Sequence, residues 1–239
     1  MSVCTHNPAT SEISQLLRGE GEAIARWNRD WDVRRLALHL TIIVLGSGSY
    51  GAAMGWWRAP EQALFVAIKL PLIILLVTAG NALINGMLAP LLGLNLRFRE
   101  SVSAIVMSFT VMSVILAAFS PVVAFFVWSL SGPAASPETV RLGYSFFLLL
   151  HVVLIALAGI VGNVRLFQFL RERAGERPSA AQNVLAAWLA VNLFLGSQLG
   201  WILRPFIGSP NLDVEFFRPN ALQGNFYEAV WNALKFILT

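Results

Sequence analysis

The sequence predicts an all-α integral membrane protein with about five transmembrane helices. Five stretches are predominantly apolar over about 20 residues, the length that a helix needs to cross a hydrocarbon core roughly 30 Å thick. Hydrophobic residues make up 56% of the chain and charged residues 13%, whereas a soluble domain usually carries about 25% charged residues. The predicted spans cover residues 36–54, 63–88, 102–127, 142–164 and 184–203.

The Lys and Arg residues predict the orientation of the chain. Eleven lie on the side of the membrane that holds the N-terminus and five lie on the opposite side. Basic residues concentrate on the cytoplasmic side of membrane proteins, so we expect a cytoplasmic N-terminus and a C-terminus outside. Three parts follow: a cytoplasmic amphipathic segment over 1–35, the transmembrane bundle over 36–203, and an extracytoplasmic cap over 204–239 that ends in a short interfacial helix.

The net charge of +4 does not indicate nucleic-acid binding. The basic residues of the N-terminal segment alternate with Glu20, Glu22, Asp30 and Asp32, and topology together with anionic headgroups explains the excess. The expected partners are the lipid bilayer and other membrane proteins, or the chain itself as a homo-oligomer. Arg outnumbers Lys by 15 to 2 and no N-glycosylation sequon occurs, which is typical of a bacterial protein of the cell inner membrane.

The N-terminal segment is expected to contain an amphipathic helix. Its apolar residues recur at helical spacing and are Ile13, Leu16, Leu17, Ile24, Trp27 and Trp31. We expect this helix to lie on the cytoplasmic leaflet, with docking to a partner protein as the alternative.

The first span carries a glycine-rich stretch that begins at Gly46. The stretch lacks the Lys-Ser/Thr of a phosphate-binding loop. We therefore expect Gly46, Gly51 and Gly55 to let helices approach closely, and Trp56 and Trp57 to form an aromatic belt at the outer interface.

The second span contains a charge at membrane depth. Lys69 lies roughly 12 Å inside the outer boundary, where it must snorkel, pair or meet water. Thr78, Asn81 and Asn85 follow at helical spacing and form a polar stripe that should face other helices. One interpretation is a snorkelling lysine with asparagines that join helices; the other is a polar cavity that binds or conducts a solute.

The remaining spans carry scattered polar residues. The fourth contains His151, which is expected to be a hydrogen-bonded structural residue, with proton relay as the less favoured role. The fifth carries Asn192, Ser197 and Gln198, which are typical of hydrogen bonds between helices.

The segment after the last span is rich in Pro, Gly and aromatic residues, so it should fold back onto the outer face of the bundle. Within it, Arg204 and Arg218 are expected to form ion pairs with nearby carboxylates, namely Asp213, Glu215 and Glu61. Residues 226–239 are expected to form the interfacial helix.

Short sequence blocks in this segment resemble those of a known group of proteins. The blocks over 203–210 (LRPFIGSP), 217–219 (FRP) and 224–228 (GNFYE) resemble a C-terminal signature of uncharacterised bacterial multi-pass membrane proteins, and the Lys69-x-Pro71 placement is similar as well. That group implies no activity. In topology alone, five spans with a cytoplasmic N-terminus also resemble the Yip1-domain proteins.

Two functions from different classes remain open. No His-Glu-x-x-His occurs and no span contains Asp or Glu, so we expect neither an enzyme nor a cofactor or metal site. The favoured function is a non-catalytic subunit, scaffold or assembly partner of a membrane complex. The alternative is a channel or transporter for a small solute or anion, with a polar path at Lys69, Asn81 and Asn85.

Overall fold

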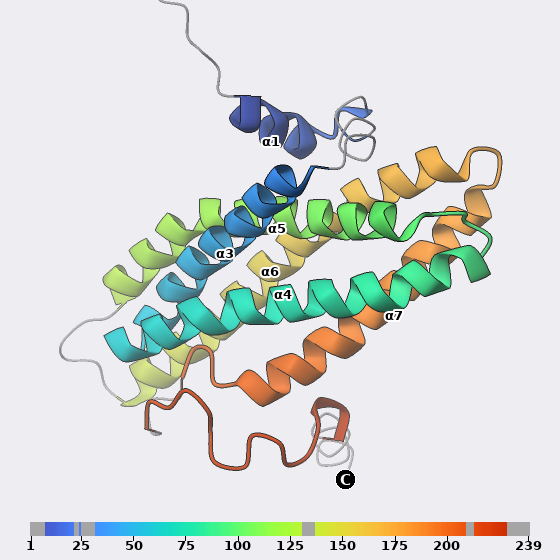
Figure 1. The fold of residues 1–239 in the computed structure, drawn as a ribbon. Helices are drawn as coiled ribbons and strands as arrows, with labels where there is room; N and C mark the ends of the chain where they lie inside the picture. The colour runs from blue at the N-terminus through green and yellow to red at the C-terminus, as the bar shows by residue number, and fades with distance from the viewer. Residues whose placement is uncertain (1–7, 22–23, 25–31, 131–136, 209–212, 229–239) are drawn as a thin grey trace, which may run out of the picture.

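A computed structural model describes residues 8–21, 24, 32–130, 137–208 and 213–228 (Figure 1). Their regular structure is helical: α1 Pro8–Arg18, α3 Val33–Trp56, α4 Pro60–Leu91, α5 Phe98–Leu130, α6 Pro137–Ala174 and α7 Pro178–Leu203. Within the described residues, five helices (α3 to α7) are long and apolar enough to cross a membrane. Each contains one predicted span, so the prediction of an all-α multi-pass membrane protein is confirmed.

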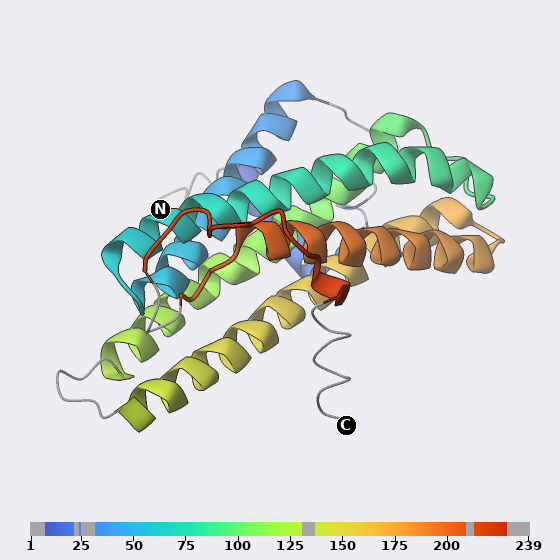
Figure 2. The same cartoon turned by 90° about the horizontal axis from the view of Figure 1, so that it is seen from below.

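The five long helices run antiparallel in chain order and form one bundle (Figures 1 and 2). Helix α3 packs against both α4 and α5, while α7 lies against α4 and α6. The outward face of α4 exposes large apolar side chains, as expected for contact with lipid. These are Leu64, Ile68, Leu72, Leu76, Leu83 and Met87.

The ends of the helices follow from local chemistry. Asp32 caps α3 by accepting a hydrogen bond from the backbone N–H of Arg34 at 3.0 Å. Pro60 and Pro178 occupy the first positions of α4 and α7, where the missing N–H has no partner to lose. Gly175 has a φ of +55° between α6 and α7, a conformation that glycine adopts without strain.

Glycines on α3 bring three helices close together, as predicted. A Cβ added at Gly46 would lie 2.6 Å from the carbonyl oxygen of Ser113 on α5. At Gly51 and Gly55 it would lie 2.5 Å from the carbonyl oxygens of Val66 and Gln62 on α4. No larger residue fits these contacts without moving a backbone, so the glycines set the distance between the helices.

Helix α1 packs against the bundle. Leu16 on α1 is 1% exposed and Ile24, beyond the end of α1, is 0% exposed, and both belong to the same apolar core as residues of α5 and α6. Arg165 on α6 donates a hydrogen bond to the carbonyl of Leu17 at 2.6 Å. The apolar face that was predicted to rest on the leaflet is thus partly buried by protein, while Trp27 and Trp31 lie outside the described residues.

The two tryptophans predicted to form an aromatic belt have different surroundings. Trp56 is 60% exposed, as a belt residue should be. Trp57 is half-buried, with its ring centroid 6.0 Å from Tyr144 and 5.5 Å from Phe147.

Candidate functional site: helix α4, the C-terminal cap and the groove beside α7

The segment that follows α7 covers one end of the bundle. We call its described residues, 204–208 and 213–228, the C-terminal cap. From the end of α7 it crosses to the beginning of α4 and then returns (Figures 1 and 2). The interfacial helix predicted over 226–239 lies largely outside the described residues.

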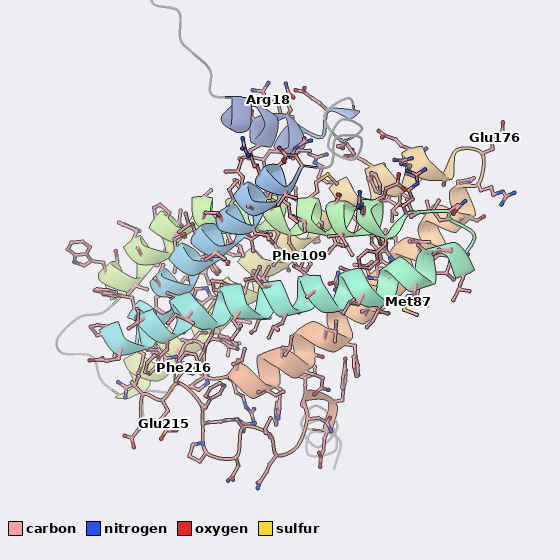
Figure 3. The ribbon with its side chains drawn as sticks, viewed as in Figure 1. Arg18, Met87, Phe109, Glu176, Glu215 and Phe216 are labelled. Carbon is pink, nitrogen blue, oxygen red and sulfur yellow. The ribbon has the colours of Figure 1, made fainter. Side chains whose placement is uncertain are left out.

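Lys69 on α4 is bound by the cap. Its side chain is 0% exposed, and its ammonium group donates hydrogen bonds to the carbonyls of Pro205 at 3.2 Å and Glu215 at 3.5 Å. Phe216 and Glu215 lie on the cap near the beginning of α4 (Figure 3). The ammonium lies 5.1 Å from the ring centroid of Phe216, within range of a cation–π interaction. Carbonyl dipoles and a ring face thus replace the water that a buried cation loses.

Gln62, two helical turns before Lys69 on α4, adds to the contact between α4 and the cap. Its amide donates hydrogen bonds to the carbonyls of Pro205 at 3.0 Å and Phe206 at 2.8 Å. Phe65, on the same end of α4, meets Phe216 edge to face, with ring centroids 5.4 Å apart. We call Gln62, Phe65 and Lys69 with their cap partners the clasp. Sequence reasoning missed Gln62, although its spacing of seven residues from Lys69 places both on one helix face.

The clasp bears on both predicted roles of Lys69. The side chain does not reach the headgroups, because it is fully buried under the cap. Its ammonium hydrogen bonds go to backbone carbonyls of the cap, so the polar path at Lys69 stays a prediction.

The polar stripe of α4 forms a hydrogen bond to another helix, which was one of the two interpretations of the sequence. Asn81 donates to Asn192 on α7, and Asn85 donates to the side-chain oxygen of Asn81 at 2.7 Å. Thr78 bonds back to the carbonyl of Ile74 at 2.6 Å. Within the described residues, no hydrogen bond links these side chains to Lys69 or His151.

His151 is buried and bonded to another helix. Its Nδ1 atom lies 2.8 Å from the hydroxyl of Tyr50 on α3, and the side chain is 3% exposed. Its Nε2 atom is buried without a hydrogen-bond partner among the described residues. Sequence reasoning predicted a hydrogen-bonded histidine but did not identify Tyr50.

Within the described residues, the predicted ion pairs of the cap do not form. Neither Arg204 nor Arg218 forms an ion pair with Asp213, Glu215 or Glu61 in the part of the chain that the structure describes. Both guanidinium groups instead lie over the ring of Trp201, at 3.2 Å and 4.9 Å from its centroid. Stacking on an aromatic face suits the planar guanidinium.

The two stacked arginines affect each other. Burial, and then the neighbouring charge of Arg218, lower the pKa of Arg204 from its usual value. Arg218 itself has two guanidinium nitrogens, Nε and Nη2, that are buried without a hydrogen-bond partner among the described residues. Trp201 therefore holds two cations close together, and the unused donors belong to Arg218.

A groove of about 1010 Å³ separates α6 from α7. The two helices diverge toward the capped end of the bundle (Figure 2), and the cap closes the groove there with Phe206 and Tyr227. Its walls are mostly apolar, and the polar side chains that line it include His151, Asn192, Ser197, Arg204 and Tyr227.

A second cavity of about 630 Å³ lies between the cap and α6. Its polar lining consists of Tyr144, Arg204, Asp213, Glu215 and Arg218. Leu148, Arg204, Phe206 and Ile207 line both cavities, so the apolar groove and this charged pocket adjoin.

Comparisons with protein-family models, curated proteins and solved structures gave no match. The resemblances drawn from the sequence therefore stay predictions.

Proposed function

We propose that this chain is a non-catalytic multi-pass membrane protein that acts as a subunit, scaffold or assembly partner of a membrane complex. The observation that carries the proposal is a cap that is clasped to α4 and exposes apolar side chains. Phe217 is 54% exposed, Leu222 is 83% exposed and Tyr227 is 45% exposed. With the predicted orientation, this surface faces the extracytoplasmic side of a bacterial inner membrane.

The cap is anchored to α4 and exposes apolar side chains, and this combination favours the docking of a partner protein. Aromatic side chains are enriched in the cores of protein interfaces, and an anchored surface loses little conformational entropy when a partner binds. Docking on this surface would cover side chains that water solvates poorly. The partner is another membrane protein or a second copy of this chain.

Permeation is the second candidate and has less support. The cap carbonyls engage Lys69, and Asn81 and Asn85 bond to each other and to Asn192. A conducting path at these residues would require that these hydrogen bonds open.

The test is purification from native membranes in mild detergent, followed by mass spectrometry of co-eluting proteins. We expect a stoichiometric partner, or a homo-oligomer, for the wild-type chain and its loss in Leu222→Asp. Gln223→Asp is the matched control, because it adds the same charge to the neighbouring exposed position without removing an apolar group. A monomer without a partner, or equal retention by both variants, would contradict the proposal.

A further inference from the structure

The groove and the charged pocket together have the polarity of a phospholipid. The groove between α6 and α7 is apolar and lies among membrane-spanning helices. The pocket beneath the cap carries charged side chains. Arg204 lines both and marks the point where the apolar part meets the charged part.

The pocket holds charges of both signs that are not paired with each other. Arg204 and Arg218 lie over Trp201, and within the described residues neither forms an ion pair with Asp213 or Glu215. Two stacked cations, one of which (Arg218) has two buried guanidinium nitrogens without a partner among the described residues, suit a phosphate, which accepts charge-assisted hydrogen bonds from several guanidinium nitrogens. The carboxylates suit a second group that is positive and donates hydrogen bonds.

The groove also offers a polar contact at His151. This residue lies on α6 one helical turn beyond Leu148, which is one of the residues that line both cavities. Its buried Nε2 atom has no hydrogen-bond partner among the described residues. When Tyr50 donates its hydroxyl hydrogen to Nδ1, Nε2 carries the proton and suits an ester carbonyl next to a lipid headgroup.

We propose that the joined cavity binds a phospholipid with a phosphoethanolamine headgroup. The acyl chains occupy the groove, the phosphate meets Arg204 and Arg218, and the ammonium faces Asp213 and Glu215. A choline headgroup has no N–H to donate to these carboxylates, and a glycerol headgroup has no positive charge. This site is independent of the protein that docks on the cap.

The headgroup is tested with the purified, delipidated protein in detergent. Binding of phosphatidylethanolamine, phosphatidylcholine and phosphatidylglycerol is measured by native mass spectrometry and by the shift in thermal unfolding temperature. We expect phosphatidylethanolamine to bind about tenfold more tightly than the other two, since one charge-assisted hydrogen bond is of that order. Equal binding of the three lipids, or no bound lipid, would overturn the proposal.

Two sets of variants assign the contacts. The double variant Arg204→Gln with Arg218→Gln should weaken binding of all three lipids. The double variant Asp213→Asn with Glu215→Gln should remove the preference for ethanolamine over choline, and it should weaken ethanolamine-lipid binding more than choline-lipid binding. If the preference persists in the second variant, the ammonium does not face these carboxylates and the proposal fails.

A matched pair of glycine variants tests the groove without relying on the charged residues. A Cβ at Gly196 on α7 or at Gly159 on α6 meets nothing within 4 Å, so both positions have room for a larger side chain. Gly196 lines the groove, whereas Gly159 is not among its lining residues. We expect Gly196→Phe to displace the acyl chains and abolish lipid binding while Gly159→Phe binds as the wild type does. Identical binding by the two variants would place the lipid elsewhere.

Discussion

Lys69 carries a charge at a depth where the bilayer does not solvate it, and the cap supplies the missing solvation. The carbonyls that accept its hydrogen bonds belong to residues 136 and 146 positions later in the chain. An unpaired charge at the centre of a membrane helix costs about 2.5 to 3.5 kcal/mol by insertion scales. Lys69 and the cap therefore stabilise each other: the cap solvates the charge, and the charge holds the cap.

Replacing Lys69 with Met should release the cap while the bundle stays folded. The variant removes both hydrogen bonds to the cap and leaves an apolar side chain that the membrane tolerates. Loss of such charge-assisted bonds costs about 1.5 to 3 kcal/mol each, less the desolvation that the lysine no longer suffers. Limited proteolysis should show faster cleavage within 205–228 in Lys69→Met.

The neighbouring lipid-facing residue provides the control for this experiment. Ile68 is 50% exposed, and Ile68→Met should leave the cap as resistant to protease as it is in the wild type. If Lys69→Met and Ile68→Met are cleaved equally slowly, Lys69 does not hold the cap.

The residue-level features were only partly predictable from the sequence. Lys69 stood out because a charge within an apolar span is rare, but its partners are set by tertiary contacts that no spacing reveals. Charge counting predicted ion pairs for Arg204 and Arg218, and the structure places both over Trp201 instead. Counting charges does not show that an aromatic face lies closer than a carboxylate.

Helix contacts in the bundle depend on small residues and short polar networks. Glycines on α3 allow backbone contact with α4 and α5, while Asn81 and Asn192 join α4 to α7. Because helices gain little hydrophobic energy from each other within lipid, close packing and hydrogen bonds contribute most of their association.

Gly51→Val should destabilise the bundle. The added Cβ would lie 2.5 Å from the carbonyl oxygen of Val66, so α3 and α4 must separate. We expect a loss of about 1 to 3 kcal/mol, the usual cost of overpacking, seen as a lower thermal unfolding temperature in detergent. Gly159→Val, on a face with nothing within 4 Å, should change this temperature little. Equal effects of the two variants would show that backbone contact at Gly51 does not limit the packing.

The positions of the long helices and the role of the α3 glycines could be predicted from the sequence. Each of the five predicted spans lies within one helix of the structure, because apolar length alone identifies a membrane helix. The role of the α3 glycines was also predicted, since their spacing has a direct steric meaning. The clasp could not be predicted, because Pro and Gly in the cap leave no periodic pattern that shows which helix it meets.

As a whole, the molecule is a bundle with α1 packed beside the start of α3 and the cap on the opposite side (Figure 1). The distribution of Lys and Arg predicts that the side with α1 faces the cytoplasm. This orientation decides which compartment supplies a partner for the cap.

The single cysteine allows a direct test of the orientation. Cys4 is the one cysteine of the chain, and a membrane-impermeant maleimide added to intact cells should not label it until the membrane is opened. Leu222→Cys, in a chain with Cys4→Ser, should be labelled in intact cells because position 222 is 83% exposed on the cap. The reverse labelling pattern would invert the topology.

In this structure the cap is anchored to α4 by the clasp and is not a free tail. The most direct measurement joins Phe65→Cys and Phe216→Cys with a short bifunctional maleimide in native membranes, in a chain with Cys4→Ser. The two rings lie 5.4 Å apart between centroids, so we predict near-complete cross-linking, detected by mass spectrometry of the joined peptides. If each cysteine reacts singly and no cross-linked peptide forms, the cap does not rest on α4 and the account is wrong.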